Sequence, residues 1–88
     1  MTLRIETTSD DHGTTIRLIG RIQAEHLEEL QAQIREGGSR IALDLKEVRL
    51  VDVEVVRFLG TCQAAGIDLV HCPPYINEWI SQEQAGVA

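Results

Sequence analysis

Two carboxylates, Asp52 and Glu54, come closest in type and spacing to residues that could do acid–base chemistry. The same pair also suits the start of a helix. Aspartate is a preferred N-cap residue, and a glutamate in the first turn is favoured by the helix dipole. No histidine, serine or lysine close to them in the sequence completes a catalytic set. We therefore predict that Asp52 caps a helix, that Glu54 lies in its first turn, and that the chain has no catalytic residue.

The residues that most often bind metals are scattered along the chain, without C-x-x-C or H-x-x-x-H spacing. They are His12, His26, His71, Cys62 and Cys72. We predict no metal site, and we expect Cys62 to be a small core residue. Gly37-Gly38 follows an expected helix and precedes an expected strand, which is the reverse of the order in a phosphate-binding loop. We accordingly expect no cofactor, and nucleotide or small-molecule binding stays a weak alternative.

Length and charge narrow the class of protein. The 88 residues suit one domain, over residues 1–88, and 8 basic against 14 acidic residues give a net charge of −6. An acidic chain with scattered arginines argues against nucleic-acid partners and against docking on an anionic membrane. No apolar run is long enough to cross a bilayer, and no signal segment opens the chain. We therefore expect a cytoplasmic protein with reduced thiols and no membrane insertion.

The first half of the chain has the pattern of a hairpin, a helix and a strand. Residues 3–8 and 14–20 alternate apolar and polar side chains, and a polar cluster at 9–13 predicts the connection between two antiparallel strands. Residues 24–36 change to a period of about 3.6, which predicts a helix ended by Gly37-Gly38. Residues 41–45 are nearly continuous in apolar character, as in a central strand covered on both faces.

The second half continues the alternation of helices and strands. We predict a loop at 46–49, with Leu50 and Val51 returning to the core, then a helix at 54–65 ended by Gly66 and a strand at 67–71. A third helix follows the proline pair at 73–74 and buries one apolar stripe, and residues 84–88 form a loose tail. The stripe comprises Tyr75, Ile76, Trp79 and Ile80. Tyr75 and Trp79 could instead form a binding patch, but their helical spacing favours the core. The predicted fold is α/β, a four-stranded mixed sheet with three helices.

This order of elements and several short segments resemble the STAS domains, the fold of bacterial anti-sigma factor antagonists. The similarity covers residues 16 to about 80, and the order and spacing of its segments are more specific than any one of them. The segments are IRLIG at 16–20, IALDL at 41–45, VRLVD at 48–52, FL at 58–59 and AGIDLV at 65–70.

The resemblance implies a switch that this chain lacks. In phosphoregulated members an Asp-Ser-Ser-Gly type motif opens the second helix, and a partner kinase phosphorylates the second serine. Here Asp52 matches the aspartate, but Val53, Glu54 and Val55 replace the other three residues. We therefore expect no phosphorylation at this position. Glu54 either supplies a fixed negative charge, smaller than that of phosphoserine, or is only a favourable first-turn residue.

By this resemblance, the leading hypothesis is a non-catalytic regulatory module. It would act through protein–protein interaction in signal transduction. Its partner would be an anti-sigma factor or a related serine kinase, and the chain could also form a homodimer through an uncovered edge. The alternative is a structural STAS subunit of a transporter or signalling assembly. The candidate partner-binding residues lie at the start and on the exposed side of the second helix, and they are Asp52, Val53, Glu54, Arg57 and Thr61.

Overall fold

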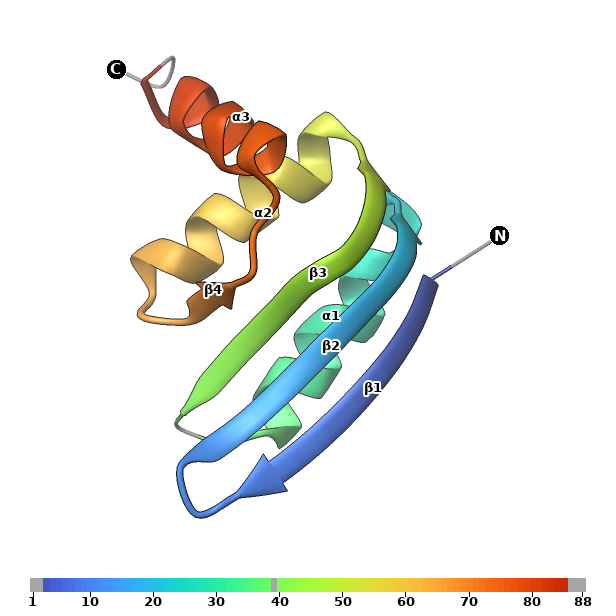
Figure 1. Ribbon diagram of the computed structural model, residues 1–88, viewed down its shortest axis with the longest axis vertical. Helices are drawn as coiled ribbons and strands as arrows, with labels where there is room; N and C mark the ends of the chain where they lie inside the picture. Colours follow the sequence, from blue (N-terminus) through green and yellow to red (C-terminus); the bar gives the residue numbers. More distant parts are fainter. Residues whose placement is uncertain (1–2, 39, 86–88) are drawn as a thin grey trace.

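The computed structural model describes residues 3–38 and 40–85, in which a β-hairpin precedes alternating helices and strands (Figure 1). The elements are β1 (Leu3–Asp10), β2 (Gly13–Ile22), the 3-10 turn η1 (Ala24–His26), α1 (Leu27–Glu36), β3 (Ile41–Val51), α2 (Val53–Ala64), β4 (Asp68–Val70) and α3 (Pro74–Ala85). The strands form one sheet in the order β1-β2-β3-β4, with β1 antiparallel to β2 and the other pairs parallel. The predicted mixed sheet with three helices is confirmed.

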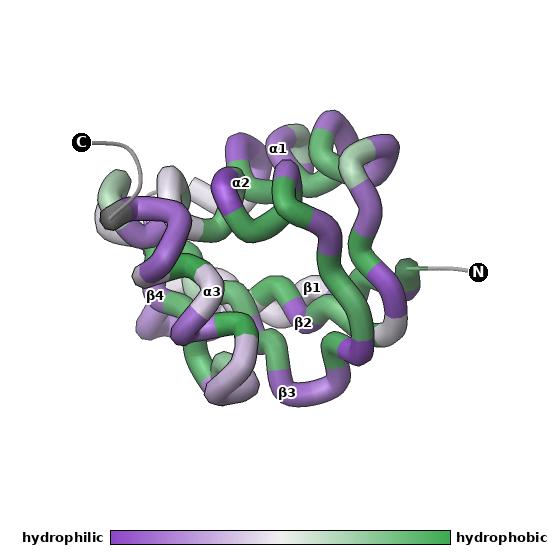
Figure 2. Tube along the Cα trace, turned by 90° about the horizontal axis from the view of Figure 1, so that it is seen from above, coloured by the Kyte–Doolittle hydropathy of each residue, from purple (hydrophilic) through white to green (hydrophobic). Residues whose placement is uncertain are grey.

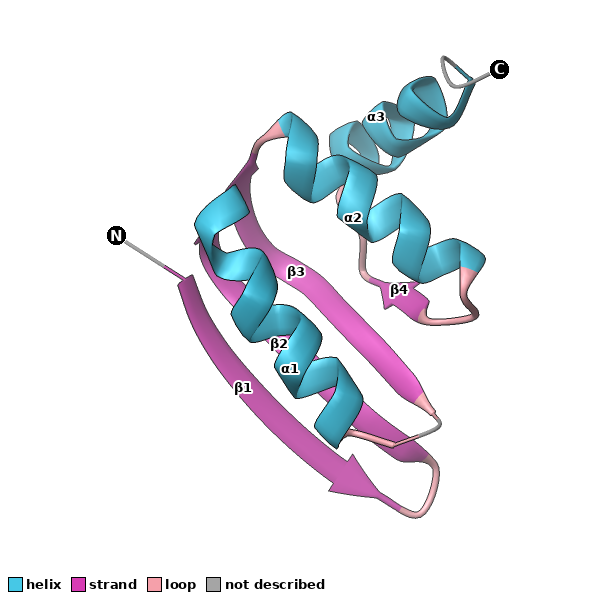
Figure 3. Cartoon of the chain, turned by 180° about the vertical axis from the view of Figure 1, so that it is seen from behind, coloured by secondary structure: helices cyan, strands magenta, loops and turns pink. Residues whose placement is uncertain are grey.

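The helices do not cover both faces of the sheet. Helices α1 and α2 form a layer over one face, and α3 packs against α2 on the β4 side (Figures 2 and 3). The core lies between these layers, and side chains such as Ile16, Leu43 and Leu59 are fully buried in it. On the opposite face Asp44, in register with Arg17, is only half-buried. The expectation that residues 41–45 are covered on both faces is therefore wrong for the described part of the chain.

The predicted loop at 46–49 is also wrong, because β3 continues through it with two bulges. Between the pairs Arg17↔Asp44 and Ile19↔Glu47, β3 has one residue more than β2. The surplus backbone N–H of Lys46 is satisfied locally, since it donates to Asp44 Oδ1 at 3.0 Å. A bulge lets a strand stay paired while it changes which of its side chains face the core. A polar run can therefore lie within the strand.

The second bulge decides which side chain at the end of β3 enters the core. It lies between Gly20↔Val48 and Arg21↔Leu50, where β3 again has one extra residue. As a result Val48 is buried, Val51 is half-buried against the core, and Leu50 is 51% exposed. The prediction that Leu50 returns to the core is wrong, because a bulge inverts the alternation that period two would give.

Several predicted boundaries shift. The hairpin connection is a two-residue turn at residues 11–12 instead of 9–13, and the Asp10 carboxylate accepts the backbone N–H of His12 at 2.7 Å.

The bounds of the helices and of the last strand also differ from the prediction. The helix predicted at 24–36 begins as the turn η1 before α1. The helix predicted at 54–65 is α2, the strand predicted at 67–71 is the shorter β4, and Gly66 lies between them with φ +97°. Helix α3 includes residues 84 and 85 of the predicted tail, and residues 86–88 lie outside the described part.

Helix α3 buries a narrower stripe than predicted. Ile76 and Ile80 are buried, and Trp79 is half-buried against the core. Tyr75 is 49% exposed, and its hydroxyl donates a hydrogen bond of 2.8 Å to the backbone carbonyl of Arg49. The prediction that Tyr75 belongs to the buried stripe is wrong. Adjacent helix positions are separated by about 100°, so Tyr75 lies at the edge of the stripe that Ile76 and Ile80 form.

Candidate functional site

Asp52 caps α2, and it also links that helix to a distant turn. Its Oδ1 accepts the backbone N–H of Val55 at 3.0 Å, as predicted for an N-cap. Its Oδ2 accepts the backbone N–H of Ala24 at 3.1 Å, which joins the start of α2 to η1. Because both carboxylate oxygens are occupied by backbone donors, Asp52 acts here as a structural anchor.

Glu54 lies in the first turn of α2 and is exposed, and Val53 beside it is 37% exposed. The Asp52 backbone is extended, with φ −109° and ψ 178°, as is usual for an N-cap residue, and the helix begins at Val53. The side chains at 53 and 54 are both exposed to solvent. The position that would hold a phosphorylated serine in the resembled motif therefore carries an accessible carboxylate.

The other two predicted site residues lie further along the exposed side of α2. Arg57 Nε donates to Glu83 Oε1 of α3 at 2.9 Å, so its guanidinium links the two helices. Thr61 Oγ1 donates to the backbone carbonyl of Arg57 at 3.0 Å. An ion pair with 65% of the arginine side chain exposed contributes at most about 1 kcal/mol to stability. These residues are thus available to a partner without being needed for the core.

Three exposed apolar side chains surround this junction, and we call Leu50, Val53 and Tyr75 the apolar cluster. They are the large apolar side chains that are exposed in the described part of the chain, at 51%, 37% and 49% respectively. Leu50 lies two residues before Asp52, and Val53 directly follows it. The Tyr75 hydroxyl binds the carbonyl of Arg49, the residue next to Leu50.

Sequence reasoning missed Leu50, and it favoured the core over a binding patch for Tyr75. The signal for Leu50 was its neighbour: two adjacent apolar residues, 50 and 51, cannot both point into the core from one strand. For Tyr75 the sequence carries no such signal, since the adjacent apolar residues Val55 and Val56 of α2 are both fully buried. Only the structure identifies Leu50 and Tyr75 as the exposed side chains.

A shallow groove adjoins Arg57 and Thr61 between α2 and α3, with a volume of about 340 Å³. Gly60 lets the two helices approach, because a Cβ there would lie 3.1 Å from Gln84 Nε2 and 3.5 Å from Ile80 Cγ2. The groove has small and apolar residues along its length and the Arg57–Glu83 pair at its rim. It extends the candidate surface from the start of α2 towards α3.

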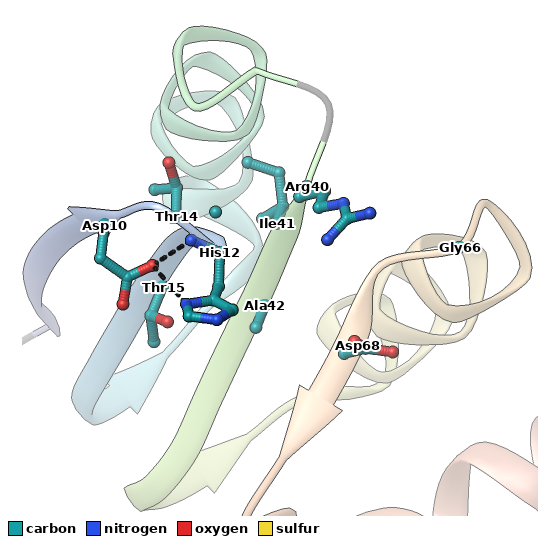
Figure 4. A pocket seen from close by; sticks show the side chains of 10 residues that line it. Asp10, His12, Thr14, Thr15, Arg40, Ile41, Ala42, Gly66 and Asp68 are labelled. Carbon is teal, nitrogen blue, oxygen red and sulfur yellow. Dashed lines mark hydrogen bonds and ion pairs between the residues drawn. The ribbon is translucent and has the colours of Figure 1, made fainter.

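A larger, polar hollow of about 480 Å³ lies at the other end of β3, beside the hairpin turn (Figure 4). It brings Arg40 and His12 together with two carboxylates, Asp10 and Asp68. None of the predicted site residues lines it. The mixture of charges of both signs selects neither an anion nor a cation, so the hollow does not define a ligand class.

The metal-binding residue types are not gathered into a site. Within residues 3–38 and 40–85, no group of three or more histidine, cysteine, aspartate or glutamate side chains is arranged to hold a metal ion. Cys62 is only 5% exposed, as expected of a core residue, and burial raises the pKa of its thiol to about 11. Burial also raises the pKa of Cys72, which is half-buried.

The buried Cys62 thiol predicts a loss of stability at alkaline pH. Its pKa is about 11 in the folded protein against an ordinary value of 9.0, so the unfolded chain loses the proton first. The stabilisation is therefore complete below pH 9 and is lost as the pH rises towards 11, by at most about 2–3 kcal/mol. Urea unfolding across this range measures it, with Cys62→Ala as the control. Parallel pH profiles for the two proteins would contradict the prediction.

Among the described helices, none combines the length and apolar character needed to cross a bilayer.

A family model described as "Mlab, STAS domain" matches residues 5–71 of the chain. No curated protein matches the chain. The matched span contains all five predicted site residues and Leu50, and it ends before Tyr75 and α3.

Proposed function

The chain belongs to the STAS domain family, and we propose that it is a regulatory module that binds another protein through the junction between β3 and α2. STAS domains are generally non-enzymatic binding modules. The single observation that supports this location is the apolar cluster: Leu50 and Val53 lie on either side of Asp52, and the Tyr75 hydroxyl binds the carbonyl of Arg49. Clustered apolar side chains on a small domain are typical of interaction sites.

The local structure indicates that Leu50 and Tyr75 are exposed because the fold places them so, which favours a binding surface. The second bulge of β3 points Leu50 outward, and the Tyr75 hydroxyl holds the bulged backbone at Arg49. Bulges often occur where a strand must redirect a side chain at a functional site. Tyrosine is also enriched at the centres of protein interfaces, because it buries a large ring while keeping a polar end.

The polar residues around the apolar cluster complete the proposed surface. Glu54 and Arg57 are exposed beside it, and Thr61 extends it along α2. A rim of charges around an apolar centre is the usual composition of a transient interface. By resemblance we propose an anti-sigma factor or related serine kinase as the partner. Because Glu54 stands where the phosphorylated serine would be, its charge at this surface is constant.

A second function has one observation in its favour. The glutamate at 54 leaves the resembled phosphorylation motif without its acceptor, so this turn has no hydroxyl for a reversible switch. A permanently bound subunit of a transporter or signalling assembly needs no such switch. Both functions use the same surface, and the identity of the captured partner separates them.

We expect Leu50→Glu to abolish capture of the native partner while the protein stays folded. A buried interfacial charge without a partner costs several kcal/mol, which corresponds to a loss of affinity of about 100-fold or more. Affinity purification from the native host with quantitative mass spectrometry measures this. Thr15→Glu, at an exposed position on β2, is the matched control.

The captured proteins then decide between the two functions. A sigma-regulatory kinase lost only with Leu50→Glu supports the first function, and transporter subunits lost in the same way support the second. If Leu50→Glu and Thr15→Glu retain the same proteins as the wild type, the apolar cluster is not the binding surface.

A further inference from the structure

The two edges of the sheet are built differently. Strand β4 has three residues, pairs with only part of β3, and is followed closely by the proline pair at 73–74. Strand β1 has eight residues, and its pairing with β2 runs without a register shift from Leu3 to Asp10. Short length and nearby prolines are common protections against edge pairing, so the β4 edge is protected and the β1 edge is long and regular.

The outer edge of β1 is also open. Within the described residues no strand pairs with it, and α1 lies over the face of the sheet without covering that edge (Figures 1 and 3). The strand contains neither proline nor lysine, the residues most often used to block an edge. Its charged residues, Arg4, Glu6 and Asp10, carry both signs, so the strand can complement a second copy of itself.

We propose that two copies of this chain pair edge to edge through β1, antiparallel, with Thr7 of one copy opposite Thr7 of the other. The occupant of the edge is thus a second copy of the same chain. The dimer has a continuous sheet, with α1 and α2 of both copies on the same face. It leaves the apolar cluster free, so this inference does not depend on the proposed function.

Charge selects this register from the alternatives. A twofold axis perpendicular to the sheet keeps each face continuous, so a residue must lie opposite itself at the axis. An axis at Glu6 places Glu6 opposite itself, and an axis at Thr8 places Glu6 opposite Asp10; both put like charges together, which is unfavourable. An axis at Thr7 places Arg4 opposite Asp10 of the second copy, twice by symmetry.

Length separates this register from the others that avoid like charges. An axis at Ser9 pairs only residues 8–10 of the described strand. An axis at Ile5 also pairs opposite charges, Arg4 with Glu6, but it uses only residues 3–7 of the described strand. The axis at Thr7 pairs every residue from Arg4 to Asp10. The side chains of Arg4 and Asp10 are 75% and 69% exposed, so both are accessible to the second copy. Thr7 and Thr8 at the centre are β-branched, as favoured in paired strands.

Sedimentation equilibrium from micromolar to millimolar concentration tests the proposal. We expect the wild type to approach twice the 9.8 kDa mass of one chain. Arg4→Asp and Asp10→Arg each place like charges opposite one another in both symmetric pairs, so each weakens the dimer by about tenfold or more. The double variant Arg4→Asp/Asp10→Arg exchanges the charges and restores the wild-type dissociation constant. Arg35→Asp, on the exposed side of α1, is the control for net charge.

Each outcome bears directly on the proposal. A wild type that stays monomeric at millimolar concentration overturns the dimer. If Glu6→Arg rescues Arg4→Asp and Asp10→Arg does not, the axis lies at Ile5 and the proposed register is wrong. A dimer that is equally stable in all variants forms elsewhere on the molecule. Circular dichroism of each variant shows whether a lower average mass comes from weaker pairing of the two β1 strands or from unfolding of the protein.

Discussion

Leu45→Ala is expected to lower the free energy of unfolding by about 2–5 kcal/mol, whereas Leu50→Ala changes it by less than about 0.5 kcal/mol. The two leucines lie on the same strand, and the substitution removes the same atoms. Leu45 is fully buried in the core, and Leu50 is 51% exposed beyond two bulges. Since a domain of this size is only marginally stable, Leu45→Ala removes a large part of the total free energy of unfolding.

Urea unfolding of the two variants measures the difference directly. Similar midpoints for Leu45→Ala and Leu50→Ala would show that Leu50 is packed in the core and that the second bulge does not form. The expected asymmetry also makes Leu50→Ala useful, because a variant with wild-type stability can report on partner binding alone. A loss of binding would then come from the apolar cluster and not from unfolding.

The sequence predicts those parts of the fold that depend on local patterns. Period-two alternation identifies β1 and β2, and a change to a period of about 3.6 identifies α1 and α2. Gly66, with its positive φ, follows the end of α2 as a glycine stop signal predicts. The order of these elements then leaves few arrangements of the sheet, so the mixed four-stranded topology follows.

The bulges of β3 depend on pairing with β2, and no local pattern contains that information. The polar residues at 46–47 look like a loop when the strand is considered alone. Only the partner strand shows that the pairing continues with an extra residue at each shift. The same limit explains Leu50: its direction is set by the second bulge, and that bulge is set by contacts with residues about thirty positions earlier.

The candidate site shows the same division between local and distant contacts. The Asp52–Val55 cap joins residues three positions apart and was predicted from residue type. The Asp52–Ala24 bond joins residues 28 positions apart, and the Tyr75–Arg49 bond joins residues 26 apart. Neither could be predicted from sequence, because side-chain contacts between distant segments depend on the finished packing of the elements.

Asp52→Ala is expected to destabilise the protein by about 1.5–2.5 kcal/mol, because one carboxylate holds two segments. Loss of the N-cap bond to Val55 costs about 1 kcal/mol, and loss of the bond to Ala24 adds roughly 0.5–1.5 kcal/mol. For a domain of this size this lowers the Tm by roughly 6–20 °C. Glu54→Ala, two residues away, removes only a favourable interaction with the helix dipole, worth about 0.3–1 kcal/mol.

Asp52→Asn separates the two roles of the carboxylate. Asparagine caps helices about as well as aspartate, so its amide oxygen can keep the bond to Val55. Its amide nitrogen cannot accept a bond from Ala24, so this variant should lose only the part of the stability that depends on the Ala24 bond. Hydrogen exchange should then be faster at Ala24 and unchanged at Val55, whereas Asp52→Ala accelerates both. If Asp52→Asn and Asp52→Ala are equally destabilised, the cap contributes nothing, and the start of α2 depends on packing alone.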